Sequence, residues 1–145
     1  MTRLVKAFWF LTVLISLAVL LYVYAGLPEV VAFDLLGNGR SLDRETSFYI
    51  ALVILSLTNF SLYALSRHMK YRSEAINTIM INWQLSLAGL LNFFYIVSML
   101  FVFLLNSGES FNFNNFGYLI FVSLGFVIIW IFVLPILLIR NRPTI

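Results

Sequence analysis

Four long apolar runs follow one another along the chain, separated by short polar segments. They cover residues 7–27, 47–66, 83–105 and 116–139, and none of them contains Asp, Glu, Lys, Arg or His. A helix needs about 20 apolar residues to cross a bilayer. Continuous apolar runs also differ from the alternating strands of a membrane barrel. The pattern therefore predicts an all-α polytopic membrane protein, a four-transmembrane-helix bundle that forms one domain over residues 1–145.

The composition agrees with this pattern. Hydrophobic residues make up 62% of the chain and charged residues 10%, whereas soluble domains carry about a quarter charged residues. A small soluble domain leaves much of its surface in water, so it could not hide this apolar excess. The composition thus excludes a soluble enzyme, a disordered tail and a nucleic-acid-binding domain. The first run is also longer than the apolar region of a signal peptide, about 7–15 residues, so we interpret it as a membrane span.

Basic residues are distributed unevenly between the predicted loops. Seven flank the spans on one side, and the other side holds Arg40 and Arg44. Short loops rich in Lys and Arg stay in the cytoplasm, so both termini are expected there. This topology accounts for the net charge of +3 without a nucleic-acid partner. The seven residues are Arg3, Lys6, Arg67, Lys70, Arg72, Arg140 and Arg142.

The second loop combines a basic cluster with an apolar periodicity. Its three basic residues, Arg67, Lys70 and Arg72, are expected to contact anionic lipid headgroups. His68, the one histidine of the chain, lies among them and is interpreted as a solvated residue rather than a metal or haem ligand. Apolar residues then recur at helical spacing through 73–82, so this segment either lies in the membrane interface or extends the third helix into the cytoplasm. The extension is favoured because no break separates the segment from Trp83.

The first outside loop, residues 28–46, contains turn and capping signals. Pro28 ends the first helix, and Ser41 and Asp43 are candidate N-caps for the second helix. Glu45 suits the positive end of that helix dipole. Capping is therefore the interpretation that we favour for these acidic residues.

A calcium loop is the alternative for the same segment. Asp34, Asn38, Gly39 and Glu45 stand at positions 1, 5, 6 and 12 of the calcium-loop template. The residues at positions 3 and 9 are both leucine, and leucine offers no side-chain oxygen. The third loop, residues 106–115, alternates aromatic and amide residues, which suits either a membrane interface or a docking patch for a partner.

Polar residues within the spans recur at helical spacing and predict the faces that point into the bundle. Asn59 and Asn92 lie at similar depths, roughly 10–14 Å below the cytoplasmic boundary at about 1.5 Å per residue. We expect these two amides to hydrogen-bond between the second and third helices, contributing about 0.6–2 kcal/mol. The predicted inward faces are Thr12 and Ser16; Ser56, Asn59 and Tyr63; and Gln84, Ala88, Asn92 and Tyr95. Pro135 removes one backbone hydrogen bond and predicts a bend in the fourth helix.

Catalytic chemistry finds little support in the sequence. The chain has no cysteine and one histidine, so thiol redox chemistry and paired haem ligation are excluded. The spans carry no ionisable group for proton-coupled transport, and no phosphate-binding loop or nucleophile motif is present. No catalytic, cofactor-binding or metal-binding residue is therefore predicted. An apolar groove for a lipid or a quinone stays open, because such pockets need no charge.

The segment after the first span resembles a known family. It reads Tyr24-Ala25-Gly26-Leu27-Pro28-Glu29-Val30-Val31, followed by Phe33-Asp34, Gly37, Gly39 and Asp43. This resembles the bacterial membrane family related to the sporulation-delaying-protein immunity protein, whose Leu-Pro-x-x-Val/Ile-Pro-x-His-Phe run lies outside the membrane between spans one and two. Ala32 stands where that family has Pro, and Asp34 stands where it has His. The resemblance implies a protein of the bacterial cytoplasmic membrane that senses or resists an envelope-acting peptide.

Two functions follow as expectations. The first is a small non-catalytic accessory or structural subunit that packs against larger membrane-protein partners and membrane lipids. The second is an envelope-sensing or immunity-type protein that acts through the outside loop 28–46. A self-assembled pore is disfavoured, because no ring of charged residues would line it.

Overall fold

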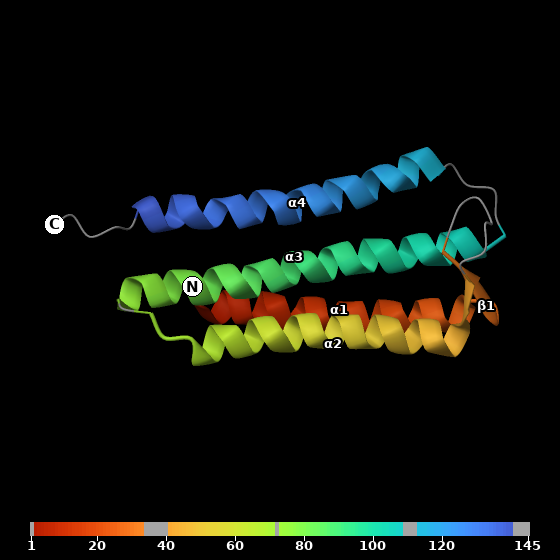
Figure 1. Cartoon of the computed structure of the whole chain (residues 1–145), viewed down its shortest axis with the longest axis horizontal. Helices are drawn as coiled ribbons and strands as arrows, with labels where there is room; N and C mark the ends of the chain where they lie inside the picture. The colour runs from red at the N-terminus through yellow and green to blue at the C-terminus, as the bar shows by residue number, and fades with distance from the viewer. Residues whose placement is uncertain (1, 34–40, 72, 109–112, 141–145) are drawn as a thin grey trace.

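A computed structural model describes residues 2–33, 41–71, 73–108 and 113–140 of the chain. Four helices run antiparallel to their neighbours in sequence, and α1 begins at the end of the molecule where α4 finishes (Figure 1). All four are long and apolar enough to cross a membrane. The elements are α1 Thr2–Gly26, β1 Val30–Ala32, β2 Ser41–Asp43, α2 Arg44–His68, α3 Glu74–Asn106 and α4 Phe113–Arg140.

The helices cover the predicted spans and extend beyond them. Leu27 is the single residue of those spans that lies past a helix end, because α1 stops at Gly26 before Pro28. Of the two candidate N-caps for α2, the structure selects Asp43, whose carboxylate accepts a hydrogen bond of 2.8 Å from the Thr46 amide. Ser41 lies in β2 instead.

The predicted extension of the third helix beyond its apolar span is present. The hydroxyl of Ser73 caps α3 by accepting from the Ile76 amide, and the helix continues without a break to Asn106. The fourth helix also begins earlier than predicted, at Phe113.

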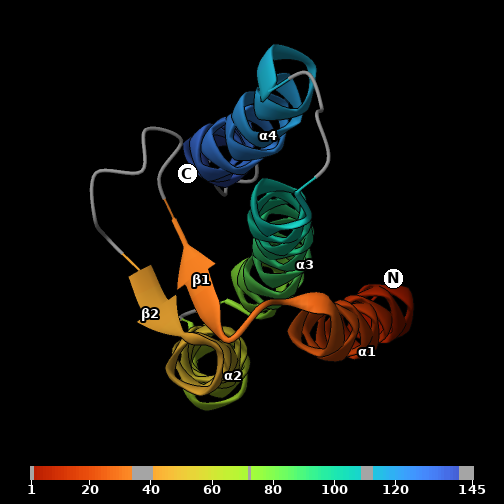
Figure 2. The same cartoon turned by 90° about the vertical axis from the view of Figure 1, so that its right-hand side faces the viewer.

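α3 is the central helix of the fold. It packs against α1, α2 and α4, and Figure 2 shows it between α4 on one side and the α1/α2 pair on the other. Among the described residues, α4 packs against α3 and against no other helix. The arrangement is therefore a three-helix core with a fourth helix on its edge, rather than a closed ring of four.

The α1–α3 interface is the most extensive between helices of the described residues. Gly89 of α3 faces the ring of Phe8, and a Cβ added to this glycine would lie 2.5 Å from that ring. At the other end of the interface, Gly26 meets the ring of Phe103 in the same way. Small residues at such contacts let helices approach closely, which drives association in lipid.

Two tryptophans join α4 to α3 by a reciprocal pair of hydrogen bonds. The indole Nε1 of Trp83 donates to the carbonyl oxygen of Trp130 at 2.9 Å, and Nε1 of Trp130 donates to the carbonyl of Trp83 at 3.3 Å. Near the opposite end of α4, the rings of Phe101 and Phe116 stack with centroids 5.9 Å apart. These contacts hold α4 against α3 at two positions along its length.

The segment between α1 and α2 contains a short hairpin that the sequence pattern did not predict. β1 and β2 pair antiparallel, with Val31 opposite Leu42. The Asn106 amide at the end of α3 binds the edge of β1: its Oδ1 accepts from the Ala32 amide at 2.8 Å, and its Nδ2 donates to the Ala32 carbonyl at 2.9 Å. This side chain therefore fixes the hairpin to the helical core.

One predicted inward-facing residue is wrong. Ser56 is exposed on α2, although it shares a helical face with the buried Asn59 in the sequence reasoning. α2 contacts the core along a narrow stripe with four-residue spacing that runs through Ala51, Leu55 and Asn59. Ser56 follows Leu55 by one residue, a rotation of about 100° that carries it off this stripe. Ser16, Gln84, Ala88 and Asn92 are buried, and Thr12, Tyr63 and Tyr95 are half-buried, as inward faces require.

Candidate functional site

A closed network of amides joins three helices near the middle of the molecule. Asn59 Nδ2 donates to Asn92 Oδ1 at 2.7 Å, and Asn92 Nδ2 donates back to Asn59 Oδ1 at 3.0 Å. Both side chains are buried, with 6% and 1% of their surfaces exposed. The structure thus places Asn59 in contact with Asn92, the residue with which its similar depth along the helices had predicted a hydrogen bond.

The remaining hydrogen-bonding groups of this pair are also used. Asn92 Nδ2 donates to Thr12 Oγ1 at 3.0 Å, and Asn59 Oδ1 accepts from Trp9 Nε1 at 2.9 Å. Asn59 Nδ2 also donates to the Leu55 carbonyl. Because every amide proton of the pair has a partner, the network acts as interhelical packing.

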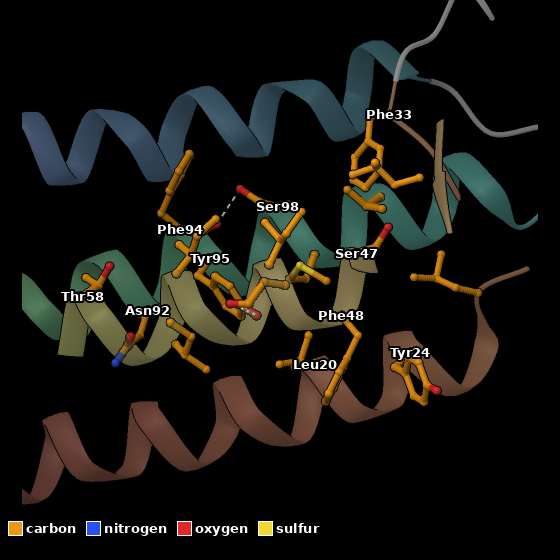
Figure 3. A pocket seen from close by; sticks show the side chains of 18 of the residues that line it. Leu20, Tyr24, Phe33, Ser47, Phe48, Thr58, Asn92, Phe94, Tyr95 and Ser98 are labelled. Atoms are coloured by element: carbon orange, nitrogen blue, oxygen red, sulfur yellow. Dashed lines mark hydrogen bonds between the residues drawn. The ribbon is translucent and has the colours of Figure 1, made fainter. Parts of the chain in front are cut away.

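Beside this network lies an elongated apolar cavity, which we call the slot. Its volume is about 460 Å³, and Figure 3 shows its walls on α1, α2 and α3. Phe33 and Leu42 line its hairpin end, and Asn92 lies toward the opposite end (Figure 3). The other residues that line it are Leu20, Tyr24, Leu27, Ser47, Phe48, Ile50, Ala51, Ile54, Leu55, Thr58, Leu91, Phe94, Tyr95, Ser98, Met99 and Val102.

The polar side chains in the slot wall bond mostly within the protein. Ser98 Oγ donates to the Phe94 carbonyl at 2.9 Å, and the Tyr95 hydroxyl donates to the Ala51 carbonyl at 3.2 Å. Ser47 Oγ donates to the backbone of Asp43. With these groups and the Asn92 amide engaged, the slot presents mainly hydrocarbon to an occupant.

The length of the slot matches one leaflet of a membrane. Its wall runs along α2 from Ser47 to Thr58, which is about 16 Å at 1.5 Å per residue. Half of a typical hydrocarbon core is about 15 Å. The slot is therefore about as long as one leaflet of the hydrocarbon core is deep.

A cation lies next to the hairpin end of the slot. The Arg44 guanidinium carbon is 5.2 Å from the centroid of the Tyr24 ring, and Nη1 donates a long bond of 3.4 Å to the Leu27 carbonyl. Both partners line the slot. Arg44 Nε is buried and has no hydrogen-bond partner in the described part of the chain.

Three acidic residues lie close to Arg44 along the chain or through the backbone of the hairpin. Asp43 and Glu45 flank Arg44, and the Glu29 carbonyl accepts a hydrogen bond from the Arg44 amide. The Thr46 amide, which donates to the Asp43 carboxylate, lowers the pKa of that carboxyl below its usual value. The exposed carboxylate of Asp43 is therefore ionised at neutral pH.

A second, shallower cavity lies where α4 meets the core, and we call it the α4 groove. Its volume is about 390 Å³, and its walls come from α1, α3 and α4. The lining residues are Phe8, Ser86, Leu90, Phe126, Ile129 and Trp130. The groove exists because α4 contacts α3 without reaching α1 in the described residues.

The predicted lipid-contact residues lie at the opposite end of the molecule from the hairpin. Arg67 is exposed in the last turn of α2, where it donates to the Tyr63 hydroxyl, and Lys70 is exposed in the following linker. Arg72 lies outside the described residues. His68 is exposed beside Arg67. Contact of this cluster with anionic lipid stays a prediction.

The calcium alternative falls largely outside the described residues, since they omit Asp34, Asn38 and Gly39. Glu45, the last position of that template, lies in the first turn of α2. Within the described ranges, no three His, Cys, Asp or Glu side chains gather as a candidate metal site.

Sequence reasoning missed Asn106 and Arg44 as site residues. Asn106 had been placed at the start of a loop, yet its amide pairs with the β1 backbone like a further strand. Its position directly after the apolar run 83–105 was the one feature of the sequence that could have indicated a capping or anchoring role. Arg44 had been counted for topology, and no pattern in the sequence places it against Tyr24 of α1.

Comparisons with known proteins assign no relative: no family model matches the chain, and neither a curated protein nor a solved structure matches it.

Proposed function

We propose that this integral membrane protein is a non-catalytic accessory subunit that packs against a larger membrane-protein partner through α4. The observation that supports the proposal is the edge position of α4, which touches α3 and leaves the α4 groove beside it. Helices associate in lipid through close packing and polar contacts rather than through hydrophobic burial. A groove with Ser86 among its lining residues offers a partner side chain both a recess and a hydroxyl.

The outward side chains of α4 fit a partner helix. Phe121, Phe126 and Phe132 are each at least half exposed, and Ile129 beside the groove is 62% exposed. Aromatic and branched side chains of this size supply the knobs that pack into a neighbouring helix. The proposal assigns the α4 groove and these residues to the partner interface.

The same proposal places the protein in a bacterial cytoplasmic membrane with both ends inside. Support comes from the basic residues and from the position of the α1 start and the α4 end at one end of the molecule (Figure 1). Because the chain has no cysteine, single cysteines can be introduced for labelling. Ser41→Cys is expected to react with an impermeant maleimide on intact cells, and Ser73→Cys only after permeabilisation. The reverse pattern would contradict this topology.

Extraction from the native membrane tests the accessory role. In a mild detergent, the protein is expected to migrate in a fixed-ratio assembly with a larger protein. Ser86→Phe fills the α4 groove and should release the protein from that assembly. Ser61→Phe, the same change at an exposed position on α2, is the matched control and should leave the assembly intact. Migration of the native protein as a monomer would contradict the proposal.

An envelope-sensing or immunity-type function is the second candidate, and one observation favours it. The outside loop 28–46 contains an ordered hairpin that Asn106 fixes over the end of the slot. A sensing protein needs such a defined surface outside the membrane. This candidate requires a protein that acts without a stoichiometric partner and a loop that binds a peptide. Peptide binding that is lost in Asn106→Leu, together with migration as a monomer, would favour it over the accessory role.

A further inference from the structure

We propose that the slot binds one acyl chain of a zwitterionic phospholipid from the leaflet on the hairpin side. In this arrangement, the lipid phosphate lies on Arg44 and its ammonium group lies among the neighbouring carboxylates. The proposal concerns a lipid site and is independent of the partner interface on α4.

The dimensions of the slot favour a single chain. A volume of about 460 Å³ spread over about 16 Å of helix gives a mean cross-section of about 30 Å². A helix with its side chains is about 10–12 Å across and needs more than twice that area. The slot is therefore too narrow for a partner helix, and its length equals the depth of one leaflet.

The chemistry of the wall favours hydrocarbon. The polar side chains described above bond mostly within the protein, so an occupant meets apolar atoms along most of the slot. Ile50 and Ile54 in its wall are about half exposed, which leaves a lateral path from the surrounding lipid. An unfilled slot would forfeit dispersion contacts, so the nearest chain in the leaflet is the natural occupant.

The charges at the hairpin end select the headgroup. Arg44 has a long hydrogen bond to a carbonyl and a buried Nε without a partner in the described residues. Guanidinium groups bind phosphate oxygens with well-matched geometry. Asp43 and Glu45 flank Arg44 in the chain, and the Glu29 backbone pairs with that of Arg44, so this end of the molecule carries both signs of charge. A phosphate joined to an ammonium group matches both signs, whereas a purely anionic headgroup matches Arg44 alone. An ethanolamine phospholipid carries this pair of charges.

Photolabelling tests the chain position. The full-length protein is reconstituted in vesicles of phosphatidylethanolamine and phosphatidylglycerol that contain a phosphatidylethanolamine with a photoreactive group at the chain end. Adducts are expected on the slot wall near Thr58 and Leu91. Ala51→Phe fills the slot and should abolish them, whereas Ala18→Phe, on the exposed face of α1, should not. Adducts spread evenly over the exposed faces of all helices would overturn the proposal.

A second slot-filling variant keeps the test conclusive if Ala51→Phe fails to fold. Ser98→Leu narrows the same cavity at a half-buried position of α3 and should also remove the adducts. Helicity and gel-filtration profiles identify folded variants. If folded Ala51→Phe and Ser98→Leu label like the native protein, the slot does not hold the chain. Displacement of the label by a quinone, but not by unlabelled phosphatidylethanolamine, would likewise reject a phospholipid.

Headgroup variants test the role of Arg44. Arg44→Gln is expected to weaken labelling by the phosphatidylethanolamine probe about tenfold, the factor that corresponds to about 1.4 kcal/mol. A diacylglycerol probe with the same chain lacks the phosphate, so its weaker labelling should not change in this variant. A phosphatidylglycerol probe should label less than phosphatidylethanolamine, because it lacks the ammonium group. Equal labelling by all three probes would overturn the headgroup assignment.

Discussion

The asparagine pair gives the most quantitative prediction. Replacing Asn92 by Leu removes three hydrogen bonds between helices, two with Asn59 and one with Thr12. Such bonds average about 0.6 kcal/mol each in membrane proteins, so their loss costs about 2 kcal/mol. One amide proton of Asn59 also loses its partner, which adds about 1 kcal/mol. We therefore expect Asn92→Leu to lower the free energy of unfolding by about 2–3 kcal/mol.

A double-mutant cycle separates this pairing from general packing. Asn59→Leu and Asn92→Leu each break the same two hydrogen bonds. The loss of unfolding free energy in the double variant should therefore be about 1–2 kcal/mol smaller than the sum of the losses in the two single variants. Unfolding in mixed micelles, followed by tryptophan fluorescence, measures the free energy of unfolding of each variant. Trp9 is a suitable probe because its indole donates to Asn59 in the native network. Asn82→Leu is the matched control, since Asn82 Oδ1 has no partner in the described residues. Additive effects within about 0.3 kcal/mol would refute the reasoning.

Three further predictions follow from other contacts. Asn106→Leu should leave the helices intact but speed hydrogen exchange at the Ala32 amide, and unchanged exchange would show that Asn106 does not fix the hairpin. Trp130→Phe removes the bond to the Trp83 carbonyl and should increase labelling of cysteines introduced at the α3–α4 contact, with no increase at the α1–α3 contact. Because a hydrogen bond lowers the Asp43 pKa in the folded state, its capping contribution is complete above the unfolded value of 3.8 and is lost as the pH falls through the lower folded value. Asp43→Asn should flatten this acid-side loss of stability in a pH series of thermal unfolding, and an unchanged profile would contradict the assignment.

The spans and the asparagine contact were predictable because they depend on local counting. Apolar run length sets each helix, and residue rise along two antiparallel helices sets the depths of Asn59 and Asn92. The cap at Asp43 and the extension of α3 from Glu74 are local signals of the same kind. Each of these features is determined by residues within a few turns of one another.

The rest depends on contacts that sequence patterns do not encode. The strands of the hairpin have three residues each, too few for an alternating pattern to identify them. In the fourth helix, Ser123 marks the buried side, but the rest of residues 119–139 is apolar, so the sequence pattern indicated no broad polar or packing face. The Trp83–Trp130 pair uses backbone carbonyls as acceptors, and any helical residue offers one. The slot arises from the spacing of three helices and therefore appears only in the tertiary structure.

Cross-linking inside the native membrane tests the partner interface most directly. A photoreactive amino acid is placed at Ile129 beside the α4 groove, and at Phe60 on the exposed face of α2 as the control. Irradiation should join the Ile129 variant to a larger membrane protein and leave the Phe60 variant with lipid adducts alone. Lipid adducts alone at both positions would contradict the assignment of α4 to a partner.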